Sequence, residues 1–176
     1  GTASMRLDAG VIGGALLVVN SAGEVFDTAT GMPWMAESAA EFRLGDPPAD
    51  QVGAYAARHR EFSPLNTTIA VIATDAALTP GGCRRVAMAA HDGLSRTIRP
   101  VHTPLDGDTV FVLATGAVEV PPKPDMPVAL LPETALTTAV GAAAADCLAR
   151  AVLAAEPVAG VPTYREMLPD AFGVTG

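Results

Sequence analysis

Three short apolar segments constrain the fold of this chain more than any other feature of its sequence. They cover Val11–Asn20, Thr67–Thr74 and Thr109–Ala114. Each is rich in aliphatic or β-branched residues, is bounded by turn-forming or polar residues, and is shorter than an ordinary helix. We therefore predict three buried β-strands, the first of which ends in a tight turn over Asn20–Glu24.

Two helical patterns accompany these strands. Thr79 is suited to cap the first helix and Pro80 to occupy its first turn, where a missing N–H costs nothing. Apolar residues then recur at helical spacing until Ile98–Pro100 ends the pattern, and a second, Ala-rich helix opens at Pro132. The order strand, strand, helix, strand, helix favours an α+β fold over alternating βαβ units. Weaker expectations are short helices over Met35–Phe42 and Gln51–Arg60, a Pro-rich connection over Ala117–Leu131 and an irregular tail from Pro157.

Composition excludes several functional classes. Hydrophobic residues make up 49% of the 176 residues and charged residues only 17%, so a packed domain is expected and disorder is not. The net charge of −8 disfavours nucleic-acid binding, which needs a basic surface. The longest apolar stretch, Ala139–Ala155, contains Asp146 and Arg150, so no membrane-spanning helix is predicted. Aromatic residues are 5%, and the core must therefore consist mainly of Ala, Val, Leu and Ile.

Cysteine usage and the first residues bear on location. Cys83 and Cys147 lie on the apolar faces of the predicted helices, where buried free thiols are expected. Two reduced cysteines suit a cytoplasmic protein. The segment Gly1–Ser4 has no Met and no signal-peptide pattern, so we predict a cytoplasmic location and leave the export of a longer precursor open.

Two polar segments stand directly before strands and are the candidates for chemistry. The loop Ser63–Asn66 contains a proline and leads into a strand that opens with two threonines. The second segment, His102–Thr109, contains Asp106 and Asp108 directly before the third strand. Since alternate side chains of a strand share a face, these carboxylates could converge on one point. On spacing alone, however, we favour the simpler interpretation that they cap the end of a strand.

The histidines do not suggest a metal centre. His59 lies in a charge cluster, His91 within the first long helix and His102 in a loop. Structural metal sites need three or four convergent ligands at recognisable spacings, which these residues lack. We predict structural or solvated roles for all three.

The two polar segments resemble the DmpA-like peptidase family. The stretch Asn66–Asp75, NTTIAVIATD, is similar to the family's self-cleavage junction. The stretch Ala90–Gly116, AHDGLSRTIRPVHTPLDGDTVFVLATG, is similar to its most distinctive block. The family includes L-aminopeptidase/D-esterases, β-peptidyl aminopeptidases and nylon-oligomer hydrolases. The resemblance runs from Gly1 to Arg165 and is nearest to the mycobacterial members.

The resemblance implies an N-terminal-nucleophile hydrolase that is made as an inactive precursor. Self-cleavage between Asn66 and Thr67 would free Thr67, whose hydroxyl attacks the substrate and whose α-amine, with a reference pKa near 7.7–8.0, acts as the base. Asp106 and Asp108 match a pair of oxygen-bearing residues that hydrogen-bond to the nucleophile and orient it, in the version similar to nylon-oligomer hydrolases. Asn20 matches the asparagine that stabilises the oxyanion. The implied substrates are small amides or N-terminal peptide bonds, with no cofactor and no metal.

The resemblance also implies that the chain is incomplete. The family fold is an αββα sandwich assembled into homo-oligomers, and Gly1–Ser4 matches a point in the middle of the family's precursors. Residues 1–66 would then end the α-chain and residues 67–176 form the β-chain, both within one domain. A catalytic lysine of relatives lies upstream of that point, and the single lysine here, Lys123, is in another segment. The predicted partner is the missing N-terminal half of the same fold.

Two alternatives stay open on the sequence. The chain could be a non-catalytic or incomplete structural subunit that keeps the motifs without the whole site. An acyltransferase of the ornithine acetyltransferase type shares this kind of fold and self-cleavage, but its motifs differ from the Asp106–Asp108 block.

Overall fold

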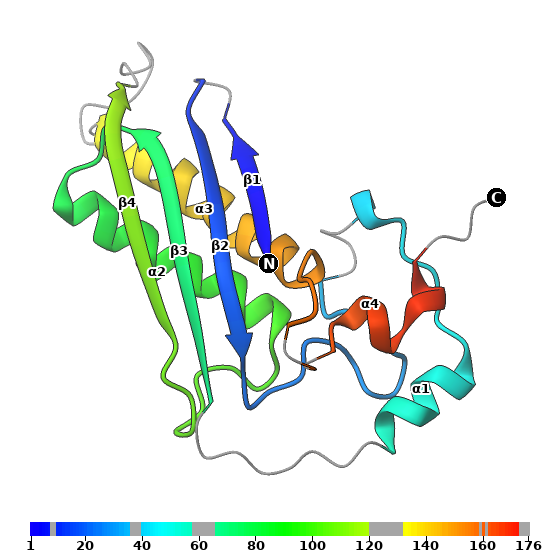
Figure 1. Cartoon of the computed structure of the whole chain (residues 1–176). Helices are drawn as coiled ribbons and strands as arrows, with labels where there is room; N and C mark the ends of the chain where they lie inside the picture. Colours follow the sequence, from blue (N-terminus) through cyan, green and yellow to red (C-terminus); the bar gives the residue numbers. More distant parts are fainter. Residues whose placement is uncertain are drawn as a thin grey trace.

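The computed structural model describes residues 1–7, 10–35, 40–57, 66–119, 132–158, 160 and 162–172. Within these residues a four-stranded sheet carries two long helices on one face (Figure 1). The predicted α+β class is therefore confirmed. The strands are β1 (Thr2–Arg6), β2 (Ile12–Asn20), β3 (Thr67–Ala76) and β4 (Thr109–Val118), and the helices are α1 (Ala49–Ala56), α2 (Pro80–Thr97), α3 (Pro132–Leu153) and α4 (Tyr164–Met167), followed by a 3₁₀ turn over Pro169–Ala171.

The three predicted strands and both long helices are present, and the differences lie in short elements. The hydroxyl of Thr79 accepts a hydrogen bond from the N–H of Gly82, as its expected capping role requires. The tail is not wholly irregular, because Thr163 and Glu166 form a capping box that starts α4. Strand β1 has little apolar alternation of its own and forms by pairing with β2.

Three of the weaker expectations fall partly outside the described residues. Helix α1 begins before the predicted Gln51–Arg60, whose last three residues lie outside the described part of the chain. Four residues of the predicted helix Met35–Phe42, at 36–39, also lie outside it. Of the predicted connection Ala117–Leu131, all but the first three residues lie there too, and β4 extends to Val118.

Strand pairing brings three chain segments to one end of the sheet. The strand order is β1-β2-β3-β4, with β1 and β3 antiparallel to β2. Strands β3 and β4 are parallel and joined through α2, so the fold contains one βαβ unit that was not expected. Asn20 lies opposite Thr67, and Ile69 lies opposite Thr109. The end of β2 and the starts of β3 and β4 therefore meet.

Small residues allow the two long helices to pack closely against each other. A Cβ atom at Gly93 of α2 would lie 2.3 Å from the carbonyl oxygen of Ala145 in α3, so only glycine permits this approach. Cys147 of α3 is fully buried, and burial raises the pKa of its thiol. Cys83 is only half-buried, because it lies in the first turn of α2. The prediction of two buried thiols is right for Cys147 and wrong for Cys83.

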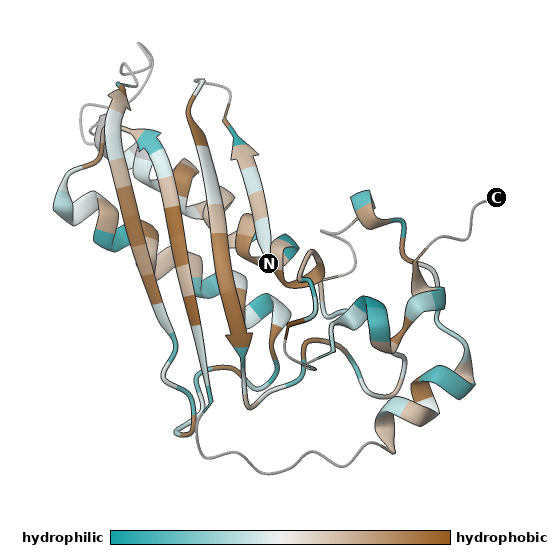
Figure 2. Ribbon diagram, viewed as in Figure 1, coloured by the Kyte–Doolittle hydropathy of each residue, from teal (hydrophilic) through white to brown (hydrophobic). Residues whose placement is uncertain are grey.

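The other face of the sheet is apolar and exposed within the described structure. We call it the open face. Figure 2 shows hydrophobic residues along β2, β3 and β4, which lie in front of α2 and α3 in this view. Neighbouring strands that expose large apolar side chains on one face are typical of an interaction site. Six large side chains on the open face are between 49% and 70% exposed: Ile12, Leu16, Val18, Ile69, Phe111 and Leu113.

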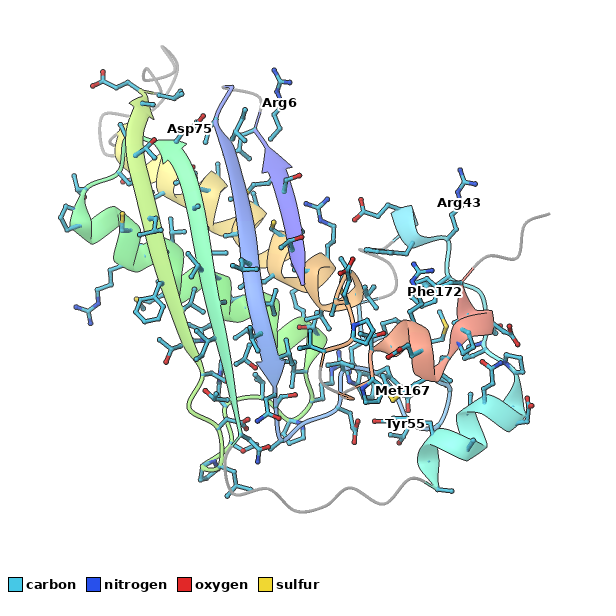
Figure 3. All side chains as sticks on the ribbon, viewed as in Figure 1. Arg6, Arg43, Tyr55, Asp75, Met167 and Phe172 are labelled. Atoms are coloured by element: carbon cyan, nitrogen blue, oxygen red, sulfur yellow. The ribbon has the colours of Figure 1, made fainter. Side chains whose placement is uncertain are left out.

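The C-terminal segment packs away from the open face. Figure 3 places Tyr55, Met167 and Phe172 around α4, beside the sheet rather than on it. There Tyr164 and Leu168 are buried in a second apolar cluster. This cluster anchors the tail, and it leaves the open face uncovered within the described residues.

We predict that Thr68→Val stabilises the protein. Thr68 is completely buried, and its hydroxyl has no hydrogen-bond partner within the described part of the chain. An unpaired buried hydroxyl costs about 1–3 kcal/mol, and valine has nearly the same shape. Thermal unfolding should show a Tm raised by several degrees. Thr74→Val is the matched control and should lower the Tm, because the buried Thr74 hydroxyl donates to the Ile12 carbonyl at 3.1 Å. A similar loss in both variants would contradict the prediction.

Candidate active site

The structure brings all five residues singled out from the sequence to one end of the sheet. Asn66 and Thr67 stand at the start of β3, and Asn20 ends β2 directly opposite Thr67. Asp106 and Asp108 lie in the loop before β4, and Asn66 forms a parallel bridge with Asp106. Segments far apart in sequence thus form one cluster.

Thr67 and Asn20 lie at the edge of the open face. Side chains alternate along β3, and Thr68 points into the core beneath the helices. Thr67 therefore points the same way as the exposed Ile69, toward the open face. Asn20 is the antiparallel partner of Thr67, so its side chain lies on that face too. The candidate nucleophile and the candidate oxyanion donor are neighbours.

The carboxylate of Asp108 is tied to the strand that carries Thr67. One oxygen accepts a hydrogen bond from the main-chain N–H of Thr68 at 2.7 Å. The other lies 2.7 Å from Nδ1 of His102. Its side chain is only 4% exposed, so both oxygens are held within the protein. Asp108 thereby holds the start of β3, and little of its side chain is exposed to solvent.

The carboxylate of Asp106 is tied to the turn after β2. One oxygen accepts from the N–H of Ala22 at 3.0 Å, and the other from the hydroxyl of Thr103 at 2.5 Å and its N–H at 3.2 Å. Partial burial alone would raise the pKa of Asp106, but these hydrogen bonds, aided by His102, hold the pKa below its usual value. Asp106 is therefore an anion at neutral pH.

The two carboxylates do not converge on one point. They precede β4, so strand alternation does not align them, and each binds a different neighbour. Asp106 and Asp108 do line one hollow of about 350 Å³, together with His91 and His102. The alternate spacing allowed a common target, but the two carboxylates instead line the same hollow and accept from different main-chain N–H groups.

Two histidines extend this cluster, and no sequence signal pointed to them. Nδ1 of His91 on α2 lies 3.3 Å from Nε2 of His102, and the two rings meet edge to face. Burial lowers the pKa of His91, and the neighbouring His102 lowers it further. When His102 donates its Nδ1–H to Asp108, its Nε2 is free to accept from His91. We predicted structural or solvated roles for both histidines, and the structure adds that they form a chain of contacts from His91 through His102 to Asp108. His59 lies outside the described residues.

Gly107 contacts both residues of the expected cleavage junction. Its main-chain N–H donates to the carbonyl oxygen of Asn66 at 3.1 Å. A Cβ atom at this position would lie 3.2 Å from Oγ1 of Thr67, which is tighter than an ordinary contact. The loop before β4 thus lies against the Asn66–Thr67 peptide.

The described residues show neither a metal-binding cluster nor a membrane-spanning helix. They contain no group of three or more His, Cys, Asp or Glu side chains arranged to hold a metal ion. None of their helices combines the length and the apolar character needed to cross a membrane.

Comparison with known proteins gives consistent matches. Residues 1–164 match the model of peptidase family S58. An uncharacterized aminopeptidase of Mycobacterium tuberculosis (strain ATCC 25618 / H37Rv) is 65% identical over 181 residues, which cover 98% of this chain and 53% of the relative. An uncharacterized aminopeptidase of Mycobacterium leprae (strain TN) is 60% identical and covers 99% of this chain and 49% of the relative. The chain thus spans about half the length of these curated relatives.

More distant matches include an enzyme named for its substrate and a solved structure. A 6-aminohexanoate-oligomer endohydrolase of Paenarthrobacter ureafaciens is 37% identical over 90 residues, or 51% of this chain and 25% of that protein. The structure of a Burkholderia sp. beta-aminopeptidase superimposes with a TM-score of 0.52 at 27% identity. That match covers 97% of this chain and 47% of the other.

Proposed function

The chain belongs to peptidase family S58, the DmpA family, and on that premise we propose that it cuts itself between Asn66 and Thr67 and then acts as an amidohydrolase through Thr67. Its substrates would be small amides or N-terminal peptide bonds. The observation that carries the proposal is the cluster of Thr67, Asn20 and the Asp106–Asp108 loop at one end of the sheet.

The proposed turnover uses Thr67 twice. After self-cleavage its hydroxyl attacks the substrate carbonyl, while its new α-amine takes the hydroxyl proton; the reference pKa of such an amine is near 7.7–8.0, which suits neutral pH. The C–N bond of the amide breaks, the proton passes to the leaving amine, and an ester to Thr67 remains. Water then hydrolyses that ester and restores the hydroxyl.

The neighbours of Thr67 have separate proposed roles. Asn20 lies on the same face and would donate its side-chain amide to the oxyanion, which is worth about 3–4 kcal/mol when the donor is well placed. Asp108 holds the backbone next to Thr67, and Asp106 holds the turn that follows Asn20. These carboxylates would orient the nucleophile and its oxyanion donor relative to each other.

We further propose that an N-terminal half completes the fold. The chain covers 53% of its Mycobacterium tuberculosis relative, and the open face carries exposed Val18 and Phe111 where a second layer could pack. A second sheet on this face would give the αββα sandwich of the family. Thr67 and Asn20 lie at the edge of the same face, so that half would also close the site. Homo-oligomers and a cytoplasmic location stay predictions.

Intact-mass analysis tests this function. Two samples are purified and assayed with amino-acid p-nitroanilides. One is the full-length protein that carries this chain, and the other is the 176-residue chain alone. We expect the full-length protein to hydrolyse an anilide and to contain a polypeptide that begins at Thr67. The chain alone should be inactive. An active protein with an intact bond between Asn66 and Thr67 would contradict the proposal, and a cut but inactive full-length protein would favour the structural-subunit alternative.

A further inference from the structure

The carbonyl of Asn66 already has a hydrogen-bond donor. The N–H of Gly107 lies 3.1 Å from the Asn66 oxygen, and this is the carbonyl that Thr67 would attack during self-cleavage. Negative charge develops on that oxygen when the tetrahedral intermediate forms. A donor held there in advance stabilises the transition state at little cost of reorganisation.

We propose that the main-chain N–H of Gly107 is the oxyanion donor for self-cleavage, and that glycine is required there because a side chain would crowd the Thr67 hydroxyl. The proposal rests on the proposed function and adds a catalytic group to it. Asn20 is assigned to the oxyanion of the substrate, whereas Gly107 serves the precursor's own peptide bond.

Both neighbours of Gly107 fix the direction of its N–H. The Asp106 carboxylate is anchored on the N–H of Ala22, and the Asp108 carboxylate on the N–H of Thr68. The loop is therefore tied to the turn after β2 on one side and, on the other, to β3 directly after the scissile bond. Such anchoring is what preorganisation of a donor requires.

The position of the Thr67 hydroxyl explains why residue 107 is a glycine. A Cβ atom at residue 107 would lie 3.2 Å from Oγ1 of Thr67 and 3.7 Å from its Cβ. A methyl group there would push the hydroxyl away from its line of attack or shift the loop. Displacements of about 1 Å near reacting atoms can cost 10²-fold in rate.

Self-cleavage at the Asn66–Thr67 bond needs no reactant other than water. The Oγ1–C bond to Asn66 forms, the peptide C–N bond breaks, and the hydroxyl proton ends on the nitrogen that becomes the α-amine of Thr67. Gly107 donates its hydrogen bond to the Asn66 oxygen while that oxygen is anionic. Water then hydrolyses the ester, which releases the Asn66 carboxyl group and restores the Thr67 hydroxyl.

An ordinary sheet hydrogen bond would have the same geometry, because Asn66 and Asp106 form a parallel bridge. The two interpretations differ in the rate of cleavage. Replacing Gly107 by glycolic acid turns its amide into an ester, which removes the N–H, adds no side chain and weakens the preceding carbonyl as an acceptor. The matched control replaces Leu105 by leucic acid, which removes the N–H that donates to the Thr103 hydroxyl at 3.3 Å in the same loop.

The measurement is the first-order rate of self-cleavage in the full-length protein, followed by intact mass. We expect the ester at Gly107 to slow cleavage by about 10²-fold and the ester at Leu105 to leave the rate within about threefold. Gly107→Ala, which keeps the N–H, should also slow cleavage, by about tenfold. Equal rates for the Gly107 ester and the unmodified protein, or equal slowing by both esters, would overturn the proposed donor. An unchanged rate in Gly107→Ala would overturn the steric requirement.

A second measurement needs no backbone change. In the Thr67→Ala protein, which should stay uncut, NMR can detect scalar coupling across the hydrogen bond between the Gly107 nitrogen and the Asn66 carbonyl carbon. Its absence would overturn the donor assignment even if an ester variant failed to fold. Cleavage of Thr67→Ala itself would instead refute the proposed function, so the two failures are distinguishable.

Discussion

Thr67→Ala should leave the full-length protein uncut and inactive. The substitution removes the only hydroxyl that can attack the Asn66 carbonyl in the proposed scheme, so neither the new α-amine nor the nucleophile forms. We expect turnover of an amino-acid anilide to fall by at least about 10⁴-fold. Intact-mass analysis should show one polypeptide that spans the Asn66–Thr67 bond.

Thr67→Ser is the matched control for this variant. Serine keeps the hydroxyl and loses one methyl group, and we expect cleavage between Asn66 and residue 67 to continue with measurable turnover. The assignment of Thr67 would be refuted by processing and full activity in Thr67→Ala. Loss of both functions in Thr67→Ser, with a folded protein, would show that the methyl group matters as much as the hydroxyl.

Asp108→Ala should reduce turnover by about 10²-fold in a folded protein. The variant loses the acceptor for the Thr68 N–H and the partner of His102, so the start of β3 is no longer held against the loop before β4. Asp106→Ala should have a similar effect through the turn at Ala22. Steady-state kinetics with an amino-acid anilide, together with thermal unfolding, measure both variants.

Asp75→Ala is the control that distinguishes two roles for Asp106 and Asp108: orienting the nucleophile, or only capping a strand. Asp75 also accepts a main-chain N–H at the end of β3, from Ile12 at 2.7 Å, but it lies at the opposite end of the strand from Thr67 (Figure 3). We expect Asp75→Ala to lower stability about as much as Asp108→Ala and to leave turnover nearly unchanged. Near-normal turnover in Asp106→Ala and Asp108→Ala would instead return both carboxylates to the strand-capping interpretation.

Local sequence was sufficient for the elements that carry their own signal. Strand β3 and helix α2 follow from an apolar β-branched run and from the Thr79 cap, and both formed as expected. The two motifs that contain Asn66 and Asp106 were also specific enough to indicate the family, which the match over residues 1–164 confirms. The roles of the site residues stay proposals.

Hydrogen bonds between side chains and groups far apart in the sequence could not be predicted in the same way. The histidine pair depends on α2 and the loop before β4 meeting, and His91 and His102 carry no motif that fixes their contact. The spacing of Asp106 and Asp108 allowed a common target, but the loop turns them toward Ala22 and Thr68. Hydrogen bonds between residues 40 to 84 positions apart depend on strand pairing rather than local pattern.

By itself the sequence determined the main strands, the two long helices and the family, because periodicity and capping are local and the motifs are long. Only the tertiary structure decided that β3 and β4 run parallel, that Gly107 lies on the Asn66–Thr67 peptide, and that Thr67 stands at the edge of an exposed apolar face. An alternating pattern shows which side chains share a face, but not which segment packs against that face. That choice is made by long-range pairing.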